Sequence, residues 1–152
     1  SRAEAVAAVA RAFADRTNQP DRLRLVHAAD HAQGMGASLR AGIGGLPADT
    51  EAVFVFLGDM PRIPTAILAP LAEAVMSGAT AAAPVFQGRR GHPAVFSRAL
   101  FPQLLASTGD QGARDVLKSL GDGLRLIQAP DNGILVDIDT PGDLRAASGL
   151  AS

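Results

Sequence analysis

Three short segments of the 152-residue chain could do chemistry, because each places charged or glycine residues directly after an apolar run. They are Leu57-Gly58-Asp59-Met60-Pro61, Gly88-Arg89-Arg90-Gly91-His92-Pro93 and Asp137-Ile138-Asp139-Thr140-Pro141. Short apolar runs predict strands, and the carboxyl ends of strands form the ligand-binding edge of an α/β sheet. Two segments supply carboxylates and one supplies cations, which suits a divalent metal holding an anionic, phosphorylated substrate.

Asp59 and Asp137 are the candidate metal ligands and the candidate catalytic residues. Asp59 directly follows the apolar run 53–57, so its carboxylate is expected in the crevice at the strand end. Asp137 and Asp139 share one face if their strand continues that far. Mg²⁺ usually takes one or two carboxylates, with water and substrate phosphate as its other ligands. The alternative is that Asp59 and Asp139 belong only to turns, in which a carboxylate bonds its own backbone.

Arg89, Arg90 and His92 lie in a glycine-flanked loop that could bind phosphate. The planar fork of an arginine matches phosphate oxygens, and Gly88 and Gly91 would let the backbone approach closely. The alternative is a solvated hairpin tip.

A fourth segment, Gly34-Met35-Gly36-Ala37-Ser38, could hold the polar edge of a ligand. It opens a predicted helix, so its first backbone amides have no partner within the helix. The alternative is a glycine-rich helix start with Ser38 as its cap.

The elements that must position these residues alternate between strands and helices, with a hairpin-like pair of strands in the middle, which predicts an α/β sheet, mostly parallel. Helices are expected at 3–14, 38–43, 64–76, 97–106 and 111–120, and strands at 23–28, 53–57, 80–86, 94–96, 124–128 and 134–136. The run 53–57 is apolar throughout, so both of its faces should be buried. Pro70 predicts a kink or a late start in the helix 64–76. Thr140 and Asp143 form a capping box that opens a last helix.

Composition narrows the function further. Hydrophobic residues make up 47% of the chain and charged residues 19%, which indicates a globular domain. A formal charge of -1 argues against a broad nucleic-acid surface. There is no cysteine, which excludes disulfides and thiolate chemistry. No apolar run is long enough to span a membrane. We therefore expect a cytoplasmic protein that binds neither nucleic acid nor membrane.

Five segments, taken in order, resemble the MobA-like nucleotidyltransferases, and within them the molybdenum cofactor cytidylyltransferases. They are residues 34–42, 57–61 and 88–93, then Gly109-Asp110-Gln111-Gly112-Ala113-Arg114, then residues 137–144 ending in Gly142-Asp143-Leu144. The resemblance runs from about residue 3 to residue 144. It implies a Rossmann-like three-layer α/β/α fold with a mostly parallel sheet, of the nucleotide-diphospho-sugar transferase type.

The resemblance also implies an activity. A nucleoside monophosphate, CMP from CTP, would pass to the phosphate of the molybdopterin cofactor with release of pyrophosphate. The reaction would need Mg²⁺, with Mn²⁺ as the alternative metal. The sequence does not settle CTP against GTP, and CTP is the expected substrate. A molybdoenzyme is the implied partner.

Site residues follow from the same resemblance. Asp59 resembles the family's metal-binding aspartate, and Asp137 matches the acid that ends the last strand in related sugar-phosphate nucleotidyltransferases. The nucleotide-binding positions are Gly34, Met35, Gly36, Ser38 and Gly58, and the acceptor side comprises Arg90, Gly91, His92 and Pro93.

One departure from the family stands out. The family opens with a strand and a glycine-rich loop whose arginine and lysine cradle the triphosphate, whereas Lys118 is the only lysine here and lies far downstream. We therefore expect residues 1–152 to form a single domain that lacks its first β-loop-α unit and is impaired in catalysis by itself. The alternative function is a non-catalytic nucleotide- or cofactor-binding module, or a chaperone for a molybdoenzyme.

Overall fold

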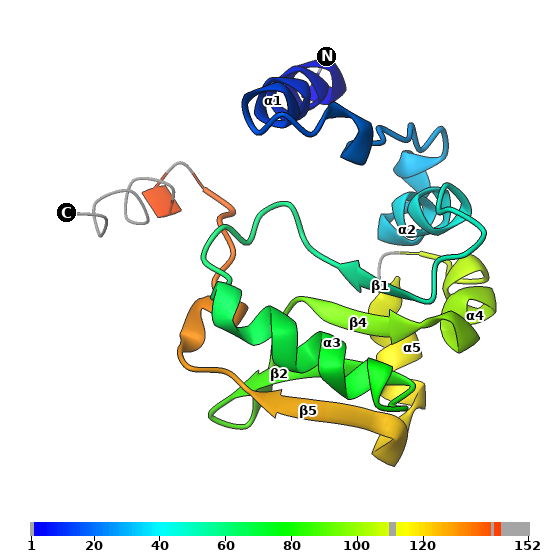
Figure 1. The fold of residues 1–152 in the computed structure, drawn as a ribbon, viewed down its shortest axis with the longest axis vertical. Coiled ribbons are helices and arrows are strands. Elements are labelled where there is room, and N and C mark those ends of the chain that lie inside the picture. The colour runs from blue at the N-terminus through cyan, green and yellow to red at the C-terminus, as the bar shows by residue number, and fades with distance from the viewer. Residues whose placement is uncertain (1, 110–111, 141, 144–152) are drawn as a thin grey trace.

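The computed structural model describes residues 2–109, 112–140 and 142–143, and its strands form one five-stranded sheet (Figure 1). The strands are β1 (Ala52–Val55), β2 (Ala81–Phe86), β3 (Arg89–Arg90), β4 (Ala94–Ser97) and β5 (Leu124–Gln128). The α-helices are α1 (Arg2–Arg16), α2 (Met35–Gly44), α3 (Leu68–Met76), α4 (Phe101–Leu105) and α5 (Ala113–Ser119). Short 3₁₀ turns are η1 (Pro20–Arg22), η2 (His31–Gln33), η3 (Thr65–Ile67), η4 (Arg98–Leu100), η5 (Gly121–Gly123) and η6 (Asn132–Leu135).

The sheet is mainly antiparallel in its pairings, so the prediction of a mostly parallel sheet is wrong. β4 pairs antiparallel with both β1 and β2, and β3 pairs antiparallel with β2. Within the described ranges only β2 and β5 pair in parallel. The cause is the short connection after β2, since a parallel crossover needs a dozen or more residues. The chain turns back as the predicted hairpin-like pair, and β4 lies between β1 and β2.

A bulge interrupts this hairpin at Gly91, His92 and Pro93. Val85 pairs with Arg90, but the next aligned pair is Ala82 with Val95. The returning strand therefore uses more residues than β2 over the same stretch, which defines a bulge. Bulges re-aim side chains, and here the extra residues are those of the predicted acceptor segment.

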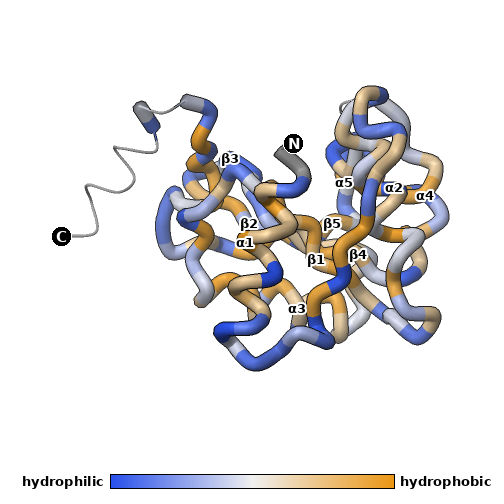
Figure 2. Tube along the Cα trace, turned by 90° about the horizontal axis from the view of Figure 1, so that it is seen from above, coloured by the Kyte–Doolittle hydropathy of each residue, from blue (hydrophilic) through white to orange (hydrophobic). Residues whose placement is uncertain are grey.

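Helices cover both faces of the sheet, which confirms an α/β architecture of three layers (Figure 1). Along β4 the side chains alternate: Ala94 and Phe96 pack with α2, α4 and α5, while Val95 packs with α3. Figure 2 shows β1 and β4 as apolar stretches running between the helices. The period-2 alternation of one central strand thus divides the core into two apolar clusters.

Two predicted strands are absent. Residues 23–28 form no strand, and Leu25 and Val26 are exposed. Residues 132–135 form η6 instead of a strand, because the Asp131 side chain accepts a hydrogen bond from the Gly133 amide at 2.7 Å. Such an Asx turn competes with extended backbone.

Among the other local predictions, the burial of β1 is wrong, whereas the late start of α3 and the capping box are confirmed. β1 is only half-buried and Phe56, just beyond it, is 50% exposed, so the prediction that both faces are buried is wrong. Pro70 lies in the first turn of α3, which starts late as predicted, and at that position the missing N–H costs no helix bond. Thr140 and Asp143 form the reciprocal bonds of the capping box.

No helix in the described ranges is long and apolar enough to cross a membrane.

Candidate functional site

The segment 131–139 joins the Asp59 loop to the His92 loop. The amide of Ile138 donates to the Asp59 carbonyl at 2.8 Å, and the amide of His92 donates to the Ile134 carbonyl at 3.0 Å. Gly91 is pressed against the same residue, because a Cβ there would lie 2.1 Å from the Ile134 carbonyl oxygen. A Cβ on Gly133 would likewise lie 2.1 Å from the Arg62 carbonyl oxygen. The acidic and cationic segments predicted from the sequence are therefore neighbours in space.

The carboxylates at this junction face solvent. Asp59, Asp137 and Asp139 are exposed, whereas Ile138 between the last two is partly buried, as the predicted alternation requires. In the part of the chain that the structure describes, no three metal-ligating side chains form a group. A metal here would rely on Asp59 and Asp137, with its other ligands from water and phosphate, which is the coordination that Mg²⁺ favours.

The charges of several neighbouring residues act on His92. Its Nδ1 atom is buried without a hydrogen-bond partner among the described residues. Burial of the ring, followed by the positive charges of Arg114 and Arg90, holds the pKa of His92 below its ordinary value, while Asp59 opposes that shift. The imidazole is therefore neutral at pH 7.

Of the predicted acceptor residues, only Arg90 and His92 present accessible side chains. Gly91 and Pro93 are buried, so they shape the bulge instead of offering a surface to a ligand. Neither Arg89, which is exposed on β3, nor Arg90 is among the residues that line the groove beside His92.

A groove of about 590 Å³ runs beside His92. Its apolar wall comes from residues 53–57, in β1 and just beyond, and its polar groups include Ser38, His92 and Arg114. Apolar walls with a few convergent polar groups are typical of small-molecule sites. Gly58 and Asp59 directly follow Leu57, the last of the wall residues.

The predicted Gly34–Ser38 segment reaches this groove through Met35 and Ser38. Gly34 is the N-cap of α2, and the Ser38 side chain makes no cap bond, so the reading of Ser38 as a cap is wrong. The amide of Gly36 donates to the Gly109 carbonyl at 2.9 Å, and a Cβ on Gly36 would lie 3.0 Å from that oxygen. This close approach fixes the segment against the loop that leads into α5.

Arg114 is the site residue that sequence reasoning missed. It belongs to the quoted segment 109–114, yet only the fold shows that it shares a groove with His92. Asp110 and Gln111 of that segment, with Pro141 and Leu144 of the last one, lie outside the described residues. A separate apolar groove of about 660 Å³ follows α1 and contains none of the predicted site residues.

The fold and the site together define an α/β protein whose carboxylates and cations meet beside a groove at strand ends, a place suited to an anionic ligand. More particularly, the chain belongs to the MobA-like NTP transferase domain family, whose model matches residues 1–124.

Two relatives show the range of this similarity. Purine catabolism protein PucB of Bacillus subtilis (strain 168) is 34% identical over 121 residues, which covers 74% of this chain and 55% of PucB. Molybdenum cofactor cytidylyltransferase of Escherichia coli (strain K12) is 29% identical over 125 residues, covering 82% of this chain and 62% of the relative. The chain thus spans somewhat more than half the length of both relatives.

Two solved structures have a similar fold. The homologue of Mycobacterium tuberculosis Rv0371c from Mycobacterium sp. strain JC1 has a TM-score of 0.65 and 29% identity, covering 74% of this chain and 56% of that one. The manganese complex of Rv0371c from Mycobacterium tuberculosis H37Rv has a TM-score of 0.61 and 25% identity, covering 72% of this chain and 57% of that one.

Proposed function

We propose that the protein is a Mg²⁺-dependent nucleotidyltransferase that transfers CMP from CTP to the phosphate of the molybdopterin cofactor and releases pyrophosphate. The observation that carries this proposal is the hydrogen bond from the Ile138 amide to the Asp59 carbonyl, which brings the two acidic segments together. Family membership supports the general reaction. The similarity to the cytidylyltransferase of Escherichia coli favours CTP and this acceptor. A molybdoenzyme would then receive the product.

Asp59 and Asp137 would hold the metal. Both carboxylates are exposed at the junction, and a hard cation prefers such oxygen ligands. The manganese bound to Rv0371c supports a divalent metal, with Mn²⁺ able to replace Mg²⁺. When bound, the metal would neutralise negative charge on the phosphates.

The chain's own groups would then position the reactants. Met35 and Ser38 would contact the nucleotide from the start of α2, where the bond from Gly36 to Gly109 holds the segment still. Arg90 would bind the acceptor phosphate with its guanidinium fork. The neutral His92 ring adds no positive charge to the site, and it borders the groove. Transfers of this kind depend on charge neutralisation and positioning more than on proton chemistry.

Asp59→Asn in the native gene product tests the proposal. We expect transfer to fall at least about 100-fold, since the amide cannot replace the charge of a metal-binding carboxylate. The melting temperature should not change, because Asp59 is exposed. Asp49→Asn is the matched control, an exposed aspartate in the turn before β1. Normal turnover of a folded Asp59→Asn protein would contradict the proposal.

A binding module without catalysis is the second candidate. It is favoured by the placement of Lys118, which is exposed, pairs with Asp115 at 3.9 Å and does not line the groove, so the chain's only lysine is not at the site. This candidate predicts that CTP binds without pyrophosphate release, in the presence of Mg²⁺ and acceptor. Pyrophosphate release above the rate of the Asp59→Asn protein would exclude it.

A further inference from the structure

We propose that Arg114, together with Arg90, forms a phosphate-binding position beside His92. The inference rests on the proposed function and deepens it, because it assigns a second cation to the substrate. The ligand is a phosphate group of a substrate: the acceptor phosphate, to which Arg90 is assigned above, with a phosphate of the nucleotide as the other outcome of the test.

The placement of Arg114 is the first argument. It is near the start of α5 and lines the same groove as His92, Met35 and Ser38. Val116 and Leu117 of the same helix are buried in the core that contains Leu104, so α5 cannot turn Arg114 away from the groove. The side chain therefore has a fixed base beside the predicted nucleotide and acceptor residues.

The charge of the groove is the second argument. Among the residues that the structure describes, no aspartate or glutamate lines the groove. Within the described part of the chain, neither Arg90 nor Arg114 forms a side-chain ion pair or hydrogen bond, whereas Lys118 does pair with an acid. Arginines without a protein anion keep their donors available for a phosphate, which accepts strong charge-assisted bonds.

The convergence of these charges on His92 is the third argument. Arg114 and Arg90 both lower the pKa of His92, after burial, although one comes from α5 and the other from β3. Their fields therefore meet at one ring.

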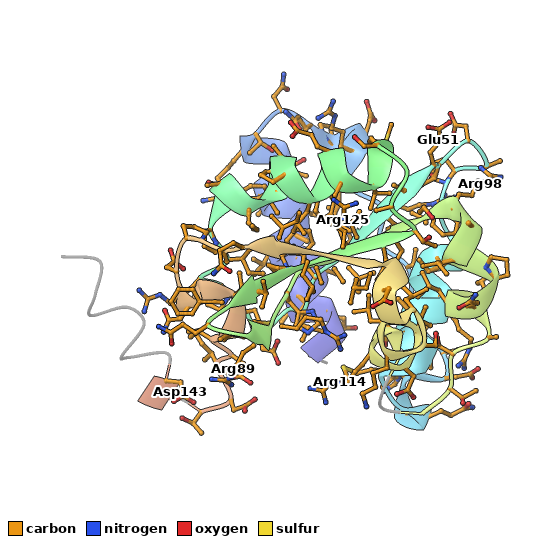
Figure 3. All side chains as sticks on the ribbon, turned by 90° about the horizontal axis from the view of Figure 1, so that it is seen from below. Glu51, Arg89, Arg98, Arg114, Arg125 and Asp143 are labelled. Carbon is orange, nitrogen blue, oxygen red and sulfur yellow. The ribbon has the colours of Figure 1, made fainter. Side chains whose placement is uncertain are left out.

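Phosphate binding without turnover tests the inference directly. Inorganic phosphate is titrated into the native gene product and followed through the NMR signal of the His92 imidazole. Arg114→Gln should weaken phosphate binding roughly 10-fold or more, the effect of removing a charge-assisted contact. Arg125→Gln, an exposed arginine of β5 outside the groove (Figure 3), should bind like the wild type. Equal binding by Arg114→Gln and wild type would overturn the inference.

A kinetic arm identifies the source of the phosphate. A higher KM for the acceptor in Arg114→Gln, with an unchanged KM for CTP, assigns the position to the acceptor. The reverse pattern assigns it to the nucleotide, and Arg114→Lys should restore part of either loss because it returns the charge. Transfer with both KM values unchanged would overturn the inference. If the wild type shows no transfer but the phosphate titration depends on Arg114, the proposed function fails while the binding position stands.

Discussion

Gly91 shows at the residue scale how the site depends on close backbone contact. Gly91→Ala would force its Cβ to within 2.1 Å of the Ile134 carbonyl oxygen, so the segment 131–139 must move. We expect a loss of about 1–3 kcal/mol in the free energy of unfolding, as for other overpacked positions. Urea unfolding would measure it. Gly44→Ala is the control, because nothing lies within 4 Å of its Cβ position. Equal stability of both variants would contradict this packing.

His92 gives the protein a pH-dependent stability. Its pKa is lowered in the fold from the ordinary 6.5 by burial, Arg114 and Arg90, against the opposing effect of Asp59. The unfolded chain therefore binds a proton that the folded chain resists, and stability falls as the pH drops below about 6.5. We expect His92→Gln to show a smaller loss of stability than the wild type between pH 7 and pH 5. Parallel stability curves for the two proteins would show that His92 does not carry this effect.

At the scale of elements, α3 is expected to contribute much more than α1 to the free energy of unfolding. Leu71 of α3 is 0% exposed, whereas Val9 of α1 is 70% exposed and Phe13 59%. Leu71→Ala should cost about 2–5 kcal/mol through the cavity that it leaves. Val9→Ala should change stability by less than about 0.5 kcal/mol. Denaturant unfolding of the two variants checks this contrast, and a large loss in Val9→Ala would mean that α1 packs against the sheet.

Strands were predictable from the sequence where an apolar segment also has a neighbouring strand to pair with. The runs that became β2, β4 and β5 are apolar and have neighbours to pair with. Residues 23–28 are apolar except for Arg24 and His27, but no neighbouring strand pairs with them in the described structure. Periodicity also carries no strand direction, so the antiparallel insertion of β4 had to be read from the short connection after β2. The turn η6 forms where the Asp131 side chain accepts a hydrogen bond from the Gly133 amide. The apolar residues that follow predict a strand and give no sign of this turn.

For the candidate site, the sequence predicted which segments lie close together but not every residue beside them. The acidic and cationic segments meet, as their places at strand ends indicated, because strands that share a direction end on one edge. The position of Arg114 in the groove was not predictable, because it depends on how α5 packs against α4 and on the bond between Gly36 and Gly109. Helix packing of that kind brings together residues whose spacing in the sequence has no pattern.

The backbone bond to Asp59 can be tested at the scale of the whole molecule. Ile138→Pro removes the amide that donates to the Asp59 carbonyl, whereas Ile138→Ala keeps it. We expect Ile138→Pro to lose most of the transfer activity while circular dichroism still reports the sheet. Ile138→Ala should retain more activity. If both variants lose activity equally, the side chain and not the amide holds the segment in place.

The same bond has a consequence for how the protein is made. Domains begin to fold during synthesis from the N-terminus, so the Asp59 loop, α3 and the hairpin all leave the ribosome before Ile138 does. Until then the Asp59 carbonyl has no amide of Ile138 to bind, and the two acidic segments are not yet joined. The junction between the two acidic segments is therefore completed after the strands of the sheet have been synthesised, and a translation product interrupted before Ile138 would hold those strands without the junction.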